Sequence, residues 1–264
     1  MNENAQFSIY QKCEIPPVNG RTHIFANIDA LYTALEEQWE LIAHEAVNDH
    51  GAFHVALAGG STPRNFYTGL SQRQSIDKKY WNKTHIYFGD ERCVPQDHPD
   101  SNYRMARESL LTIAPILPTH VHAMFSERLS VEENVERYET LLHNELPADA
   151  CGHPVFDLIL LGMGEDGHTA SLFPGTEILQ ETEKSVAAQY VQKLAAWRVS
   201  LTFPTINAAN HVAVLVAGEA KAGVLSHIFS TEKNHAASYP IQQVNPAGQL
   251  DWYLDAAAAR LIKT

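Results

Sequence analysis

The sequence predicts an α/β protein in which helices flank a mainly parallel sheet. One observation is that short apolar segments alternate along the chain with segments whose apolar residues recur every three or four positions. The other is that several apolar segments run directly into polar loops that contain glycine, as the carboxyl ends of parallel strands do where a ligand binds. We find no internal repeat and no linker-like stretch, so we expect one domain.

The first half of the chain is predicted to contain an entry strand, two further strands and four helices. Residues 1–22 suggest a tail with an entry strand, interrupted by Pro16-Pro17, and the single domain is expected over 23–264. A helix is expected at 27–46 because its apolar residues share one face. A strand at 53–58 precedes a helix that starts at Pro63, since proline is tolerated in a first turn. A strand at 84–88 and helices from 101 and over 131–146 follow.

The second half is predicted to be richer in strands. Apolar runs at 155–161 and 212–217 are typical of buried parallel strands, and the second of them leads into a helix over 219–229. Further strands are expected at 186–191, 198–203 and 250–253, and an alanine-rich helix over 255–262 closes the chain.

Composition excludes several classes of function. The chain has 264 residues, enough for a substantial core, and a formal net charge of −12. Binding to nucleic acid or to an anionic membrane relies on broad basic surfaces, so neither is expected. A small anionic ligand stays possible, because two or three well-placed cations suffice for it.

Cysteine usage and the N-terminal residues favour a cytoplasmic protein. Cys13, Cys93 and Cys151 are widely spaced and form no C-x-x-C pair, so we expect reduced thiols rather than a disulfide framework or a cysteine zinc site. Neither a signal peptide nor an apolar run of about 20 residues is present.

Residues 59–63 (GGSTP) join a predicted strand to a predicted helix. Backbone N–H groups of Gly59 and Gly60, the hydroxyls of Ser61 and Thr62 and the positive end of a helix together favour a phosphate group. The alternative is a plain turn, but the flanking strand and helix stand where phosphate binding requires them.

Two further loops carry charges at strand ends. Residues 89–92 (GDER) offer Asp90 and Arg92, which can position a polar substrate, with the guanidinium on phosphate oxygens; a solvated turn with local ion pairs explains the same residues. Arg198 opens one predicted strand and Lys221 follows another, and both are candidate phosphate cations, although either alone reads as a surface charge.

The loop over 162–168 (GMGEDGH) follows the apolar run at 155–161. His168 can move a proton near neutral pH, and Asp166 is a candidate carboxylate to orient its ring. Residues so close in sequence need not hydrogen-bond, which leaves that orienting role open. His120 and His122 lack accompanying ligands, and no metal site is predicted.

Taken together, these segments closely resemble the 6-phosphogluconolactonase family. The resemblance rests on six ordered segments within roughly residues 25–255: AGGSTP at 58–63, FGDERCVP at 88–95, SNYRM at 101–105, LGMGEDGHTASLFP at 161–174, RVSLTFPTIN at 198–207 and GEAK at 218–221. Six motifs in the same order are far more specific than any one of them.

The resemblance implies a Rossmann-like fold of the sugar-phosphate isomerase/deaminase type. It also implies hydrolysis of 6-phospho-D-glucono-1,5-lactone, the second step of the oxidative pentose phosphate pathway, without an organic cofactor or a required metal. In that reaction His168 is the expected base, and Arg92, Arg198 and Lys221 with residues 59–62 are the expected substrate-binding groups. Backbone N–H groups of Gly162, Gly164 and Gly167 are candidate donors to the tetrahedral oxyanion. A monomer or small homo-oligomer is expected.

Two other functions and one other mechanism stay open. The related glucosamine-6-phosphate deaminases carry a glutamate five residues after the loop histidine and tend to have tyrosine in the D-E-R motif; here those positions hold Phe173 and Arg92, which favours the lactonase. A non-catalytic phosphosugar sensor usually adds a DNA-binding module, which we do not identify. A serine nucleophile lacks its G-x-S-x-G elbow.

Overall fold

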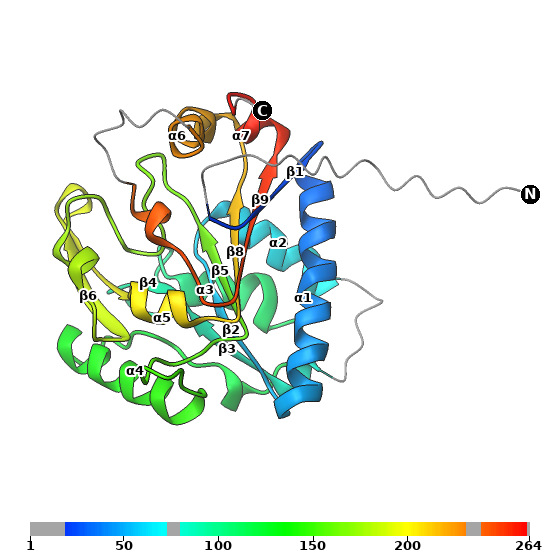
Figure 1. Ribbon diagram of the computed structural model, residues 1–264. Helices are drawn as coiled ribbons and strands as arrows, with labels where there is room; N and C mark the ends of the chain where they lie inside the picture. The colour runs from blue at the N-terminus through cyan, green and yellow to red at the C-terminus, as the bar shows by residue number, and fades with distance from the viewer. Residues whose placement is uncertain (1–18, 73–79, 231–238, 263–264) are drawn as a thin grey trace, which may run out of the picture.

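The computed structural model describes residues 19–72, 80–230 and 239–262. Its larger sheet confirms the predicted parallel arrangement, with six strands in the order β1-β9-β8-β5-β2-β3 and every neighbouring pair parallel (Figure 1). The strands are β1 (Arg21–Phe25), β2 (Phe53–Leu57), β3 (Thr84–Phe88), β5 (Leu158–Gly162), β8 (His211–Val216) and β9 (Gln249–Asp255).

A second, three-stranded antiparallel sheet was not predicted as a separate unit. It has the order β4-β7-β6, formed by β4 (Asp90–Arg92), β7 (Ala196–Leu201) and β6 (Val186–Val191). Residues 192–195 join β6 to β7, and a connection this short makes the two strands antiparallel. Residues 90–92, read from the sequence as a loop, form a strand because they pair with β7.

The helices cover the sheet and differ at their ends from the sequence-based prediction. Helix α2 starts at Ser61, two residues before the expected Pro63, which stands in the first turn where a missing N–H is harmless. The expected helix over 219–229 begins with a 3₁₀ turn, and α5 was missed altogether. The helices are α1 (Ile28–His50), α2 (Ser61–Gln72), α3 (Asn102–Ala106), α4 (Val131–Glu145), α5 (Phe203–Ala208), α6 (Ala222–Ile228) and α7 (Ala256–Ala259).

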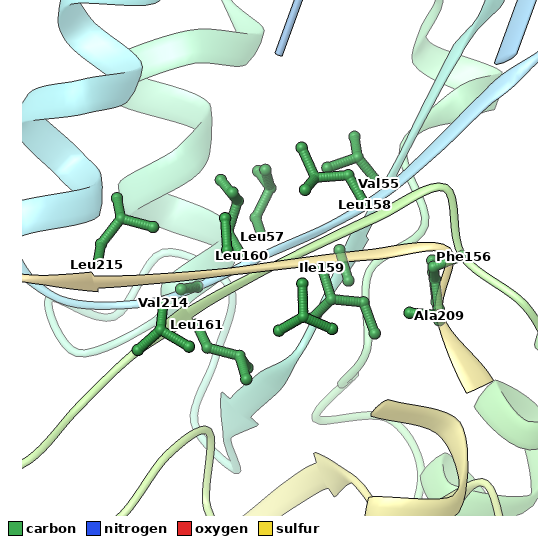
Figure 2. Packing of buried hydrophobic residues seen from close by; sticks show 14 of the residues in the cluster. Val55, Leu57, Phe156, Leu158, Ile159, Leu160, Leu161, Ala209, Val214 and Leu215 are labelled. Atoms are coloured by element: carbon green, nitrogen blue, oxygen red, sulfur yellow. The ribbon is translucent and has the colours of Figure 1, made fainter. Parts of the chain in front are cut away.

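Strand β5 lies at the centre of the hydrophobic core. Leu158 and Leu160 project from one face of the sheet and Ile159 and Leu161 from the other, and all four are buried (Figure 2). Burial on both faces explains why this strand reads as a continuous apolar run. Helix α1 covers one side of the sheet, while α4 packs against β6 and β7 (Figure 1).

The N-terminal boundary differs from the one drawn from sequence. β1 (Arg21–Phe25) crosses the limit expected between residues 22 and 23, and the Pro16-Pro17 segment lies outside the described residues. Among the helices in the described part of the chain, none is long and apolar enough to cross a membrane.

Candidate active site

One pocket gathers most of the residues singled out from the sequence. Its volume is about 260 Å³, and it opens where β2, β3, β5 and β8 end. The predicted site residues that line it are Gly59, Gly60, Ser61, Thr62, Asp90, Arg92, Gly162, Gly164, His168, Arg198 and Lys221. Asp166 and Gly167 are absent from the lining of the pocket.

Asp166 is hydrogen-bonded to the ring of His168. Its Oδ1 lies 2.5 Å from His168 Nδ1, and the same oxygen accepts the His168 backbone N–H at 3.3 Å. With Nδ1 held by a carboxylate, Nε2 is the ring nitrogen left for proton transfer. This hydrogen bond is the contact that Asp166 needs in order to orient the His168 ring, a role that the sequence left open.

The protonation states of the pair suit a neutral base beside an anion. Burial lowers the pKa of His168, and the bond to Asp166 only partly offsets this effect. Burial opposes ionisation of Asp166, but hydrogen bonds from Lys193 and His168 prevail and hold its pKa below the usual value. The imidazole is thus unprotonated near neutral pH.

Two side chains that the sequence analysis did not assign to the site surround this pair. Phe173 stacks on His168 with ring centroids 4.2 Å apart. Lys193, from the turn between β6 and β7, forms an ion pair with Asp166 Oδ2, and its ammonium lies 4.6 Å from the Phe173 ring centroid. Lys193 stands in no motif, and only the tertiary structure brings it to the loop.

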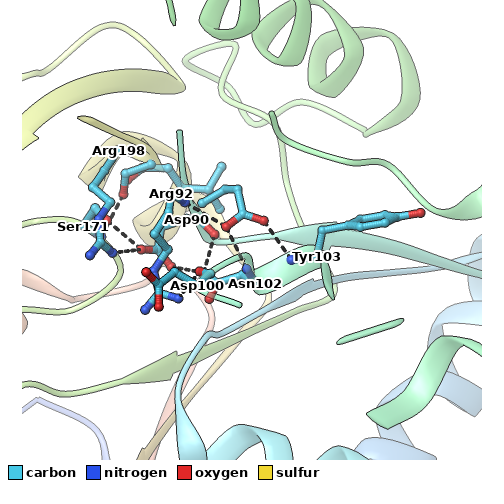
Figure 3. A network of polar contacts seen from close by, with 10 residues as sticks. Asp90, Arg92, Asp100, Asn102, Tyr103, Ser171 and Arg198 are labelled. Carbon is cyan, nitrogen blue, oxygen red and sulfur yellow. Dashed lines mark hydrogen bonds and ion pairs between the residues drawn. The ribbon is translucent and has the colours of Figure 1, made fainter. Parts of the chain in front are cut away.

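Asp90 organises a buried polar network beside the pocket (Figure 3). Its Oδ2 accepts the Ser171 hydroxyl at 2.6 Å and lies 3.8 Å from Arg198 Nη1. Asn102 donates to Asp90 Oδ1 at 3.1 Å and to its carbonyl at 2.8 Å. These contacts hold the Asp90 carboxylate beside Arg198, and its predicted role in substrate binding stays a prediction.

Arg92 and Arg198 face each other across the β4–β7 ladder, where they form a register pair. Arg92 Nη1 donates to the Asp100 carbonyl at 2.6 Å, and the Arg198 side chain is only 12% exposed. The buried Nε of each arginine has no hydrogen-bond partner among the described residues. Two cations held side by side in the lining of one pocket are suited to an anionic ligand.

The loop over 59–62 has the geometry expected for anion binding. Gly60 has φ of 103°, a conformation that favours glycine, and Ser61 and Thr62 form the first turn of α2. A Cβ atom on Gly59 would lie 2.1 Å from Asn102 Oδ1, so this position has no room for a side chain. Lys221, at the end of a 3₁₀ turn, reaches the same pocket from the β8 side.

The glycine loop is held by its own backbone. The Gly164 N–H donates to the His168 carbonyl at 2.8 Å and the Gly167 N–H to the Gly164 carbonyl at 3.1 Å. Since both amides are engaged, this conformation does not support the expectation that they bind an oxyanion. Gly162, which lines the pocket, stays a predicted donor.

A metal centre finds no support in the part of the chain that the structure describes. It contains no group of three or more histidine, cysteine, aspartate or glutamate side chains arranged to hold an ion. His120 and His122 instead belong to a stack of rings with His85, whose centroids lie 3.8 Å and 5.5 Å from theirs.

An α/β fold with a basic pocket and a histidine at its strand ends defines a class of phosphosugar-type enzymes, and comparison with known proteins places the chain within it. The sequence model of the family described as glucosamine-6-phosphate isomerases/6-phosphogluconolactonase matches residues 26–252. The chain belongs to this family.

Individual relatives point to one branch. A 6-phosphogluconolactonase of Synechocystis is 39% identical over 219 residues, which cover 83% of this chain and 88% of the relative. The solved structure of 6-phosphogluconolactonase from Trypanosoma brucei is 30% identical and superposes with a TM-score of 0.80 over 92% of this chain and 99% of that one. A monomeric glucosamine-6-phosphate deaminase, 18% identical with a TM-score of 0.73 over 91% of this chain and 99% of its own, shares the fold.

Proposed function

We propose that the chain hydrolyses 6-phospho-D-glucono-1,5-lactone to 6-phospho-D-gluconate in the oxidative pentose phosphate pathway. The observation that carries the proposal is one pocket with His168, held by Asp166, and the cations Arg92, Arg198 and Lys221. His168, oriented by Asp166, can accept a proton from water, and the three cations can bind the phosphate group of the substrate. Similarity to 6-phosphogluconolactonases adds support.

The substrate's phosphate would bind between the α2 N-terminus and the cations. Ser61 and Thr62 would donate hydrogen bonds to it, while Arg198 and Lys221 would balance its charge. Binding energy at the phosphate would orient the lactone carbonyl against His168, because the two ends of the ligand cannot move independently.

Hydrolysis would then proceed by general base catalysis. His168 Nε2 takes a proton from water as the oxygen attacks the lactone carbonyl, and the tetrahedral intermediate collapses with cleavage of the bond to the ring oxygen. The imidazolium returns the proton to that oxygen, which leaves as a hydroxyl. No covalent bond to the enzyme is needed.

The deaminase alternative lacks the carboxylate that its ring-opening chemistry uses. Phe173 occupies the position of that carboxylate, and its aromatic ring stacks on His168. Cytoplasmic location, a monomer or small homo-oligomer, and independence of nucleic acid, membrane and cofactor stay predictions, as does the single domain over 23–264.

The test measures hydrolysis of freshly generated 6-phosphogluconolactone above the spontaneous rate, with ammonia release from glucosamine-6-phosphate assayed in parallel. Fast lactone loss without ammonia is expected. In His168→Gln, kcat should fall by roughly 10²–10⁴ because the base is gone. Ammonia release would favour the deaminase, and phosphosugar binding without turnover would favour the sensor. Near-native turnover in His168→Gln would remove this residue from the mechanism.

A further inference from the structure

Lys193 reaches the histidine loop from the second sheet and contacts two of its side chains. It stands in the turn between β6 and β7, whereas Asp166, His168 and Phe173 all belong to the loop after β5. Its ammonium contacts that loop at two points, the Asp166 carboxylate and the face of the Phe173 ring. Phe173 in turn stacks on His168. The four side chains therefore form a closed ring of contacts.

The two oxygens of Asp166 are divided between two cationic or proton-donating partners. Oδ1 contacts His168 Nδ1, and Oδ2 contacts Lys193. A carboxylate that served His168 alone would fix its tautomer but would also stabilise the protonated ring, which is useless as a base. A second cation on the same carboxylate removes that disadvantage and leaves the hydrogen bond intact.

We propose that Lys193 is a positioning residue that neutralises the Asp166 carboxylate, so that Asp166 orients His168 without favouring the imidazolium. The inference rests on the proposed function only in calling His168 the base. The electrostatic effect of Lys193 on Asp166 and His168 is a property of the unliganded protein. Three charged groups among the described residues act on His168: Asp166 from its own loop, Asp90 from β4 and Lys193. The other cations of the pocket, Arg92, Arg198 and Lys221, line its remaining wall.

The direction of the effect follows from the charges. Asp166 and Asp90 raise the pKa of His168, while Lys193 lowers it, in the same sense as the dominant effect of burial. Removal of the ammonium withdraws a repulsion from the imidazolium and frees the carboxylate to attract it. Both changes have the same sign, so the histidine should protonate at higher pH.

The test compares Lys193→Met, Lys193→Arg and wild type by NMR titration of the His168 Cε1–H signal, assigned by its loss in His168→Gln. In Lys193→Met the midpoint should move to higher pH, and Lys193→Arg should restore it. Lys184→Met, which removes an exposed lysine just before β6, is the matched control and should titrate as wild type.

Kinetics supply the second readout. In Lys193→Met the acid limb of the pH profile of kcat/KM should shift to higher pH. Activity should then fall about two- to fivefold at pH 6, the size expected for the loss of a partly exposed ion pair. At pH 8 the loss should be much smaller. An equal loss at all pH values with an unmoved NMR midpoint would overturn the inference in favour of a merely structural contact. A moved midpoint in a protein that does not hydrolyse the lactone would uphold Lys193 and refute the proposed function instead.

Discussion

Gly59 shows how one missing side chain sets the arrangement of the pocket. The Asn102 amide occupies the space beside its Cα, and from there it donates to Asp90, which lies next to Arg198. The sequence marks Gly59 as part of a phosphate loop but cannot reveal that its neighbour is Asn102. A tightly packed contact of this kind depends on the tertiary structure.

Gly59→Ala should therefore impair both stability and activity. The new methyl group would force Asn102 away from Asp90, at a cost of about 1–3 kcal/mol in the free energy of unfolding, typical of overpacking. We expect kcat/KM to fall by roughly tenfold or more, since a small displacement in a site is costly. Urea unfolding and lactone hydrolysis measure the two effects.

Gly223→Ala is the control for that substitution. A Cβ atom there meets nothing within 4 Å, and the position is in α6, where alanine is preferred by about 1 kcal/mol. Its stability should be unchanged or higher and its activity normal. Equal behaviour of the two variants would contradict the role given to Gly59.

At the scale of elements, Glu91 joins β4 to α3. Its buried carboxylate accepts the backbone N–H groups of Asn102 and Tyr103 at 2.7 Å each, together with the Ser101 hydroxyl at 3.1 Å. Burial raises the pKa of Glu91, while these hydrogen bonds oppose the rise. An anion at this end of a helix also interacts favourably with the helix dipole.

Glu91→Gln should destabilise the protein because one of the two acceptor oxygens becomes an N–H₂ group that faces donors. The expected loss is about 1–3 kcal/mol, the usual cost of leaving buried polar groups unpaired. Glu108→Gln, which alters an exposed carboxylate paired with Arg104, should cost much less, because an ion pair on a helix surface adds little to stability. Thermal unfolding measures the stability of both variants. Similar melting temperatures would show that the Glu91 carboxylate does not stabilise the connection between β4 and α3.

Prediction from sequence succeeded for elements whose pattern is local. The strands at β2, β3, β5 and β8 are buried on both faces, and their apolar runs with glycine after them are visible in the sequence. The antiparallel sheet escaped prediction because β4 has only three residues and exists through its pairing with β7. Lys193 was missed for the same reason, since nothing in its neighbourhood marks the turn that places it near Asp166.

At the scale of the whole molecule, a cluster of histidine rings lies at the amino-terminal ends of β2 and β3, opposite the pocket. His54 and His85 are the second residues of these strands, and their ring centroids are 4.9 Å apart. Burial, reinforced by the neighbouring histidines, lowers the pKa of His54 to about 3 and that of His85 to about 4. His122, beside them, is lowered to about 4 for the same reasons.

The cluster should make stability fall with acidification. In the unfolded chain these rings protonate near pH 6.5, whereas in the folded protein they stay neutral down to about pH 4. Between those values the unfolded state binds more protons, so the free energy of unfolding decreases as pH falls. A loss of about 2–5 kcal/mol between pH 7 and pH 4.5 is expected, allowing for partial exposure of the rings.

His122→Gln should reduce that pH dependence, because one titrating ring is removed. His98→Gln, at a partly exposed histidine whose ring contacts Asp100 rather than the cluster, should leave it unchanged. Urea unfolding at a series of pH values measures the slope. Identical slopes in the two variants would show that the cluster does not govern acid stability.

The pairing of β1 with β9 bears on how the chain reaches its native state. The two strands are joined from Arg21↔Asp251 to Phe25↔Asp255, and Arg21 reinforces the pairing through a two-pronged contact with Asp251 at 2.7 and 2.8 Å. During synthesis, β1 leaves the ribosome long before its partner exists, and the edge of β8 stays open until β9 arrives. Closure of the sheet is therefore a late event with a high contact order, and it should be slow. A nascent chain stalled before residue 249 would expose an unpaired strand on each side of the gap, which is the state most in need of a chaperone.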